Sequence, residues 1–563
     1  MTVSSTGLVR PLSAEAAPPR RVLGPGGERR RSSARDYVVS VNPGSQSYDV
    51  VVVGGGHNGL VSAAYLARAG LSVLVLERLD HTGGAAVSVE PFSGHAARLS
   101  RYSYLVSLMP ERLMADLGLD VRLASRTTAS YTPWTRGERS GGLLVERPEG
   151  EATRASFREL TGGDEEYAAW QEFYAEVGKV AEVVAPTLMQ PLPLEREIRA
   201  MVDERTWTDV VAQPLGRAIT SRFSDDTVRG VVATDALIGT FASMDDRSLI
   251  QNRCFLYHLI GNGTGEWRVP IGGMGAVTDA LAKAAVEAGA EIVTGAGVSA
   301  IHPGPDGAEV VWHEGGHQRS ATGRRVLSGV APWVLRILLG EGEDAETKPV
   351  GSQLKINFLL DRLPALRSGA DPAVAFAGTL HLAEDYTQLE RAYDAAVGGA
   401  VPDPMPGEVY CHSLSDPSIL GDRAGSAHTL TYFGLHTPAG LFDADPEARD
   451  VATRRALASL DAVLAEPIED CIARDADGRL CIEAKIPQDV EKDLAMPGGH
   501  IFHGDLEWPW APNRSRLETP AQQWGVQTEH DVVLLCGSGA RRGGAVSGLG
   551  GHNAAQAVLA DLA

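Results

Sequence analysis

Residues 48–70 read YDVVVVGGGHNGLVSAAYLARAG, and this stretch decides the fold. The valine run at 50–53 is typical of a buried parallel strand, and a glycine-rich turn follows it at once. We expect a helix from about 57 to 69 that stops at Gly70, and then a second buried strand over 71–76. The stretch therefore predicts a β-α-β unit of the Rossmann type.

The glycines of this turn have the G-x-G-x-x-G spacing, at Gly54, Gly56 and Gly59. The first allows a tight turn, the second lets the backbone approach a pyrophosphate, and the third lets helix and strand pack closely. Glu77 ends the second strand 23 residues after Gly54, where a carboxylate accepts hydrogen bonds from ribose hydroxyls. The alternative is a plain glycine turn with a solvent-exposed glutamate.

Two further glycine clusters favour FAD over a nicotinamide cofactor. Gly83 and Gly84 let the chain pass close to a second part of a long cofactor. Near the C-terminus, Gly537 and Gly544 belong to a glycine-rich segment that precedes an expected helix, whose N-terminus would face the flavin end. An ordinary strand-to-helix turn is the alternative for this last segment.

Composition excludes several functional classes. The 563 residues carry a net charge of −21, which repels nucleic acid. The five cysteines are scattered, with no C-x-x-C pair for a dithiol or a zinc site, so no metal centre is predicted. No run of about 18 apolar residues predicts a membrane span, although peripheral membrane contact stays open.

Residues 1–47 are rich in Arg, Pro, Gly and Ser and cannot form a core, so a disordered extension is expected there. A cytoplasmic location is expected, since the scattered cysteines favour a reducing compartment, and organellar import through this Arg-rich stretch is the alternative. Residues 150–265 have helix-like patterns interrupted by prolines and read as an inserted helical region.

The sequence resembles the phytoene-desaturase-like FAD-dependent oxidoreductases, particularly the branch that contains pyridine nucleotide-disulfide oxidoreductase domain-containing protein 2. The resemblance rests on stretches spread along the chain. They are YDVVVVGGGHNGLVSAAYLARAG at 48–70, TGGAAVS at 82–88, SRYSYLVSLMP at 100–110, WRVPIGGMGAVTDALA at 267–282, VLSGVAPW at 326–333 and LLCGSGARRGGAVSGLGGHNAA at 534–555.

This resemblance implies an α/β fold with a discontinuous Rossmann-type FAD-binding domain and an inserted α+β substrate domain. The FAD-binding domain would comprise 48–150, 265–345 and 490–563, and the substrate domain 151–264 and 346–489. The implied contacts to the ADP half are Gly54, Gly56, Gly59, Glu77, Gly83 and Gly84. Val298 would flank the adenine, Gly537 and Gly544 would approach the flavin, and His57, Asn58 and Arg78 complete the predicted cofactor-binding set. The sequence departs from the family at Ala540-Arg541-Arg542, where relatives often have Thr-His-Pro.

Candidates near the chemistry are Arg101, Tyr104 and His503. A histidine can take a proton as hydride leaves, but a structural histidine is the alternative reading of His503. Arg101 can equally pair with a phosphate or an acid. Arg541 and Arg542 either stabilise a reduced flavin or form a solvated surface pair. Tyr167, Trp170 and Tyr174 share one helical face, as core or as substrate lining.

The sequence thus predicts an FAD-dependent dehydrogenase or desaturase that removes hydride from a small apolar, lipid- or isoprenoid-like substrate. With only one complete dinucleotide fingerprint, dioxygen or a quinone is the expected electron acceptor. An amine oxidase is an alternative that requires an aromatic cage, and a non-catalytic regulatory flavoprotein that acts through partner binding is a third.

Overall fold

The computed structural model of the protein describes residues 46–261 and 265–563. The predicted disordered extension lies outside the described residues, except for Gln46 and Ser47, which begin the first strand. The first sheet has seven strands, and its central order is β10-β11-β12-β1-β2-β9 with β18 also paired to β12. Its strands are β1 (Gln46–Val53), β2 (Val73–Leu76), β9 (Glu291–Val293), β10 (Gly297–Gly304), β11 (Gly307–Glu314), β12 (His317–Ser328) and β18 (Val533–Leu535).

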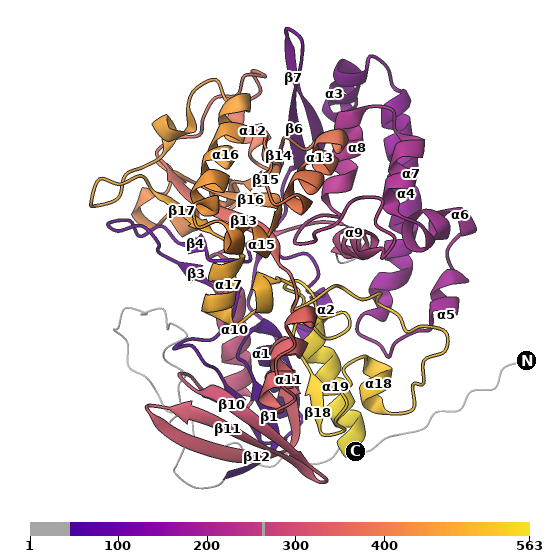
Figure 1. The fold of residues 1–563 in the computed structure, drawn as a ribbon, viewed down its shortest axis with the longest axis vertical. Coiled ribbons are helices and arrows are strands. Elements are labelled where there is room, and N and C mark those ends of the chain that lie inside the picture. Colours follow the sequence, from indigo (N-terminus) through magenta and orange to yellow (C-terminus); the bar gives the residue numbers. More distant parts are fainter. Residues whose placement is uncertain (1–45, 262–264) are drawn as a thin grey trace, which may run out of the picture. The chain divides into compact units, whose positions relative to one another are not determined.

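The predicted β-α-β unit is confirmed. β1 runs parallel to β2 and to β12, and β12 runs parallel to β18, so segments from both ends of the chain meet in one sheet. Helix α1 (His57–Arg68) packs against α10 (Met274–Glu287) and α19 (Leu549–Leu562), which Figure 1 shows beside the first sheet. Leu60, Val61 and Leu281 are fully buried in this contact. Apolar helix faces closing over the parallel strands make this core, while β10, β11 and β12 extend the sheet in antiparallel pairs.

A second sheet of seven strands follows the order β17-β13-β16-β15-β14-β6-β7. Its strands are β6 (Thr128–Arg136), β7 (Arg139–Glu146), β13 (Ser352–Leu360), β14 (Thr379–Leu382), β15 (Gly407–Tyr410), β16 (His428–Pro438) and β17 (Ile482–Lys485). All its pairs are antiparallel except that of β6 with β14. Every residue of β13 is buried, including Lys355 and Asn357, so this strand is covered on both faces.

One predicted boundary needs correction. The sequence places 48–150 in the cofactor domain, but the hairpin of β6 and β7 belongs to the second sheet, because Thr379 and Leu380 of β14 pair with Ser130 and Tyr131 of β6. This pairing joins residues far apart in the chain, and local patterns do not reveal such partners. The other domain limits stay predictions.

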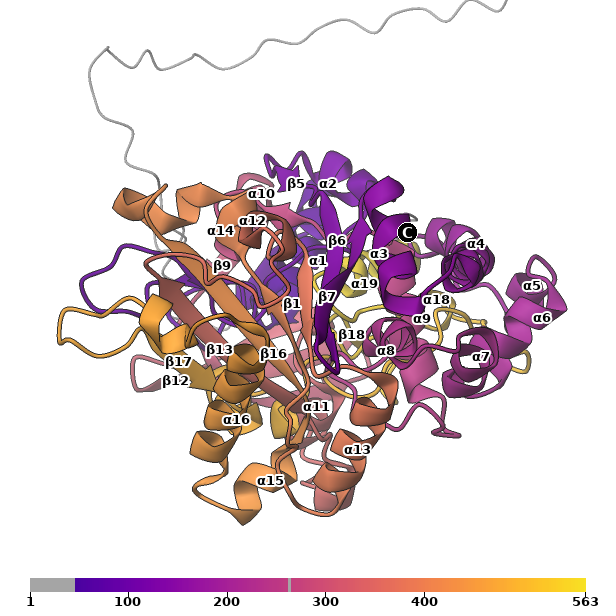
Figure 2. The same ribbon diagram turned by 90° about the horizontal axis from the view of Figure 1, so that it is seen from above.

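The predicted helical insertion is present. Its helices are α3 (Glu151–Thr161), α4 (Glu165–Val184), α5 (Glu195–Arg199), α6 (Glu204–Trp207), α7 (Leu215–Arg222), α8 (Asp226–Thr234) and α9 (Ile250–Ile260). They gather beside the β6–β7 edge of the second sheet, where α3 contacts β7 (Figure 2). Aromatic side chains fill their shared core, among them Phe173, Phe223 and Phe255.

Shorter elements complete the fold. The strands are β3 (Ser88–Val89), β4 (Leu99–Ser100), β5 (Leu123–Ala124) and β8 (Val269–Pro270). The helices are α2 (Glu111–Leu117), α11 (Pro332–Leu338), α12 (Pro372–Ala375), α13 (Tyr386–Val397), α14 (His412–Ser415), α15 (Ala439–Ala444), α16 (Ala448–Val463), α17 (Pro487–Leu494) and α18 (Pro520–Trp524). All five cysteines are buried free thiols.

Candidate active site

The glycine turn after β1 has the geometry that the fingerprint requires. Gly54 adopts a φ of +101°, and its amide donates to the Leu76 carbonyl at 2.8 Å. A Cβ at Gly59 would lie 2.1 Å from the Gly54 carbonyl oxygen, so only glycine allows α1 to approach β1 this closely. A Cβ at Gly56 would meet nothing within 4 Å, because this residue faces a cavity.

Glu77 ties the end of β2 to this turn. Its carboxylate accepts a hydrogen bond from the Gly55 amide and another from the Leu79 amide, both at 2.8 Å. Burial raises the pKa of the Glu77 carboxyl, and the two backbone donors offset part of this rise. The side chain is buried and the residue lines the cavity, so its predicted role as the ribose-binding carboxylate stays open to it.

The H-N-G part of the motif joins the two ends of the chain. The His57 Nε2–H donates to the Ala545 carbonyl at 3.0 Å, and Asn58 Nδ2 donates to the Gly543 carbonyl at 3.2 Å. Burial lowers the pKa of His57 to about 4, so the ring is neutral and can hold this position without a buried charge. These contacts explain why His57 and Asn58 accompany the glycines.

A single cavity of about 780 Å³ opens along these segments. Its wall includes nearly all of the predicted cofactor-binding residues, which are Gly54, Gly56, His57, Asn58, Gly59, Glu77, Arg78, Gly84, Val298, Gly537 and Gly544. Gly83 alone lies outside this lining in the described chain, and its amide instead donates to the Gly55 carbonyl at 2.9 Å. The individual contacts to the cofactor stay predictions.

These residues fit a dinucleotide cofactor. The volume lies within the range of about 300–1,000 Å³ that small-molecule and cofactor sites occupy. Asn58 Oδ1 is buried without a hydrogen-bond partner among the described residues, as expected of an acceptor that a ligand would satisfy. Because Gly54, Gly56 and Gly84 have no side chains, a cofactor can approach the backbone directly at these three positions of the cavity wall.

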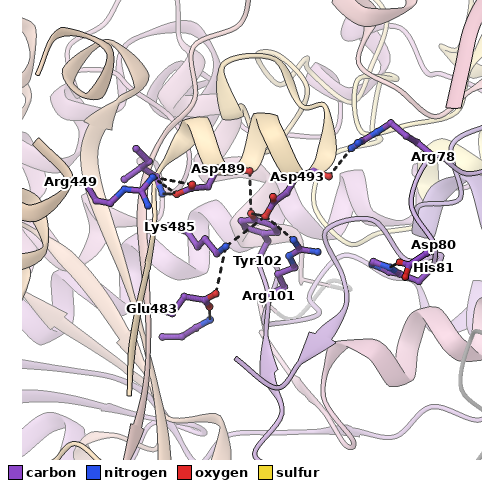
Figure 3. Close-up of polar contacts among 12 residues, drawn as sticks. Arg78, Asp80, His81, Arg101, Tyr102, Arg449, Glu483, Lys485, Asp489 and Asp493 are labelled. Atoms are coloured by element: carbon purple, nitrogen blue, oxygen red, sulfur yellow. Dashed lines mark hydrogen bonds and ion pairs between the residues drawn. The ribbon is translucent and has the colours of Figure 1, made fainter. Parts of the chain in front are cut away.

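Helix α17 closes part of this wall through a polar network (Figure 3). The Asp493 carboxylate accepts hydrogen bonds from the Tyr102 hydroxyl at 2.6 Å and from Arg101 at 2.8 Å, and Lys485 lies 3.7 Å away. Arg78 donates to the Asp493 backbone carbonyl at 2.7 Å. Because Arg78, Tyr102 and Lys485 line the cavity, the network fixes α17 beside the predicted nucleotide site.

The three catalytic candidates occupy different places. Tyr104 and His503 line the cavity. Arg101 is not among the described residues that line it, and it forms a salt bridge with Asp493. His503 has a φ of +66°, and its Nδ1 has no partner among the described residues. Burial lowers the pKa of His503 to about 3, so the ring is a weak proton acceptor at neutral pH. Their catalytic roles stay predictions.

Arg541 and Arg542 do not form a solvated surface pair. Arg542 is 1% exposed and donates to the backbone carbonyls of Thr187, Gln190 and Trp524. Arg541 donates to the carbonyls of Trp508 and Trp510. The solvated alternative is therefore wrong, because these guanidinium groups fix loops around the C-terminal glycine segment. Arg542 also lines a smaller cavity of about 310 Å³ next to His503.

The far half of the cavity is lined by Trp170 and Tyr174 of the predicted aromatic stripe. It also contains residues that the sequence did not single out, which are Arg126, Asp235, Lys355, His381, Glu408, Tyr410 and Phe433. Most of these come from the second sheet and from α4. One sequence signal could have found some of the charged residues among them. Lys355 in QLKINFLL is a charged residue within an apolar strand pattern.

The parallel strands of the first sheet, the fingerprint turn and the cavity define a dinucleotide-binding flavoprotein fold. A family model described as "Flavin containing amine oxidoreductase" matches residues 59–369. The chain belongs to this family of flavin-dependent oxidoreductases, and its cofactor is FAD.

The chain is 52% identical to an uncharacterized protein of Mycobacterium tuberculosis (strain ATCC 25618 / H37Rv), over 92% of this chain and 98% of that one. It is 30% identical to pyridine nucleotide-disulfide oxidoreductase domain-containing protein 2 of Rattus norvegicus, over 92% of this chain and 94% of the rat protein. The solved structure of a putrescine oxidase mutant covers 92% of this chain and 100% of its own, with a TM-score of 0.55 and 16% identity. The predicted fold and family resemblance are thus confirmed.

Regarding membranes, no helix within 46–261 or 265–563 combines the length and apolar character needed to cross a bilayer.

Proposed function

We propose that this flavoprotein is an FAD-dependent dehydrogenase or desaturase that removes hydride from an apolar, lipid- or isoprenoid-like substrate. One observation carries the proposal. The cavity continues without interruption from the fingerprint glycines into a wall of apolar and aromatic side chains, among them Leu105, Leu108, Trp170 and Phe433. Such a wall binds a carbon skeleton by removing apolar surface from water.

FAD bound along the fingerprint glycines would supply a hydride acceptor for a substrate C–H bond. The protein must align that bond and exclude water. The aromatic rings of Tyr104 and Tyr410, with centroids 4.7 Å apart, form a rigid part of the wall for this purpose. Lys355 can exchange a proton at Nζ, since burial lowers its pKa to about 7.

A second candidate function is amine oxidation, and the same wall supports it. Tyr104 and Tyr410 supply paired aromatic faces, and Asp235 and Glu408 place carboxyl groups in the cavity. Aromatic faces and acids together bind an ammonium group, which makes a cationic end on the substrate compatible with this pocket. In either case we propose dioxygen or a quinone as the electron acceptor.

Anaerobic reduction of the flavin tests these functions. The purified FAD-loaded protein is mixed with long isoprenoid hydrocarbons or with primary amines, and loss of the visible flavin absorbance is followed. Bleaching by the hydrocarbons supports the first candidate, and bleaching by the amines alone supports the second. If neither class bleaches a flavin that dithionite reduces and dioxygen reoxidises, both are contradicted and a regulatory flavoprotein acting through partners is favoured.

A further inference from the structure

Three potential metal ligands lie together in the second sheet, at the far half of the cavity. His381 on β14 is the direct cross-strand partner of Glu408 on β15, and Glu384 follows the end of β14. One donor atom from each of the three lies within 4.8 Å of the others. All three side chains are buried, with exposed fractions of 2–4%.

Glu384 is the residue that most needs a partner. Its two carboxylate oxygens are buried, and Thr234 is the one described hydroxyl that approaches them as a weak donor. No described cation acts on this carboxylate. An unpaired buried carboxylate is costly, so a proton or a bound cation must neutralise it.

The surrounding charges favour a bound cation. Asp235, Glu384 and Glu408 act on one another, which amounts to three negative charges when all are ionised. Arg126 acts on both Glu408 and Asp235, and Arg147 acts on Asp235 as well. When all three carboxylates are ionised they outnumber these two arginines, so a bound cation would lower the net negative charge of the cluster.

The histidine is oriented as metal-bound histidines are. Thr132 Oγ1 lies 2.8 Å from His381 Nδ1, and in the tautomer in which Nδ1–H donates to this hydroxyl, Nε2 is left for a ligand. The Tyr410 hydroxyl donates to Glu408 and holds one of the two carboxylates in place.

We propose that His381, Glu384 and Glu408 bind a first-row divalent transition-metal ion such as Zn²⁺ or Mn²⁺. One imidazole nitrogen and two carboxylates are a donor set that these ions accept. His381 and Glu408 both line the cavity, so the coordination positions that the protein leaves open face the substrate space. A hydroxyl or carboxylate of a substrate would complete the coordination there. The spacing of the three residues matches no short sequence motif, so only the sheet brings them together.

The test measures metal binding to the FAD-loaded protein. Chelator-treated protein is titrated with ZnCl₂ or MnCl₂, and bound metal is measured by mass spectrometry after gel filtration. We expect one equivalent per chain and a rise in the thermal unfolding midpoint. Glu384→Gln keeps the side-chain size but removes the charge, and we expect affinity to fall by about 100-fold or more. Glu309→Gln, on the exposed side of β11, is the matched control and should bind like wild type.

Thr132→Val is a second variant, in case Glu384→Gln does not fold. It removes only the hydroxyl behind His381, and we expect about a 10-fold loss of metal affinity with an unchanged flavin spectrum. A wild-type protein that binds no metal would overturn the proposal and show that the glutamates carry protons instead. Equal affinity in wild type and Glu384→Gln would overturn it as well. Neither readout involves substrate turnover, so it is independent of the function proposed above.

Discussion

The nucleotide half of the cavity is built largely from backbone, whereas the far half is built from side chains. In the first half, bare glycine backbone and one glutamate surround the cofactor space, and their positions follow from a single turn between β1 and α1. In the second half, strands β13 to β15 and helices α4 and α8 each supply one or a few side chains. Binding of a common cofactor therefore depends on local geometry, and selection of a substrate depends on how distant elements pack.

The largest effect is expected when one carbon atom is added to a glycine of the backbone-built half. In Gly59→Ala the new Cβ collides with the Gly54 carbonyl oxygen, so we expect loss of FAD and destabilisation by about 3 kcal/mol or more. In Gly56→Ala the Cβ meets only cavity space, so we expect a folded protein that loses FAD. Flavin absorbance per chain and urea unfolding separate the two outcomes. Gly440→Ala, with open space around it, is the control.

In the side-chain-built half, the contribution of a buried lysine to the free energy of unfolding should depend on pH. Burial lowers the pKa of Lys355 from 10.5 to about 7, so the unfolded chain binds more protons than the folded one between those values. Stability contributed by this group therefore rises with pH from about 7 to 10.5, with a slope approaching about 1.4 kcal/mol per pH unit. In Lys355→Met this slope should vanish. Urea unfolding of both proteins at several pH values checks it, and parallel profiles would contradict it.

Glu77→Gln sharpens the role of the single acid in the backbone-built half. The amide cannot accept both of the hydrogen bonds from Gly55 and Leu79, so one of these backbone donors loses its partner. We expect the dissociation constant for FAD to rise about 10-fold, which corresponds to roughly 1.4 kcal/mol. Titration of the apoprotein with FAD, followed by flavin fluorescence, measures it. Glu309→Gln should bind FAD like wild type.

The smallest effect is expected where side chains support the backbone-built half. Asp493→Ala removes the acceptor for Tyr102 and Arg101 but leaves the backbone carbonyl that Arg78 binds (Figure 3). We expect FAD to dissociate about 3- to 10-fold faster, with unchanged flavin absorbance in the loaded protein. Stopped-flow release of FAD measures this rate. Lys492→Ala on the same helix is the control, and an equal rate in both variants would show that α17 does not hold the cofactor.

The fingerprint shows how much of the fold local patterns predict. The expected strand, helix and second strand were each found within a few residues of their predicted limits, because a valine run, a glycine turn and a terminating glycine act within one β-α-β unit. The helical insertion was predicted from helix-like patterns interrupted by prolines, which are local signals too. The β6–β7 hairpin was misassigned, since its partner strand β14 lies far along the chain.

The sequence by itself determined the cofactor-binding turn and the glutamate that supports it, because backbone conformation and close packing there require particular residue types at fixed spacing. Tertiary structure alone decided the far half of the cavity. His381 and Glu408 become cross-strand partners only when β14 and β15 pair, and Arg542 becomes buried only when the 187–190 segment and the end of α18 close around it. Long-range pairing of this kind leaves no periodic signal in the chain, so it is decided when the sheets assemble.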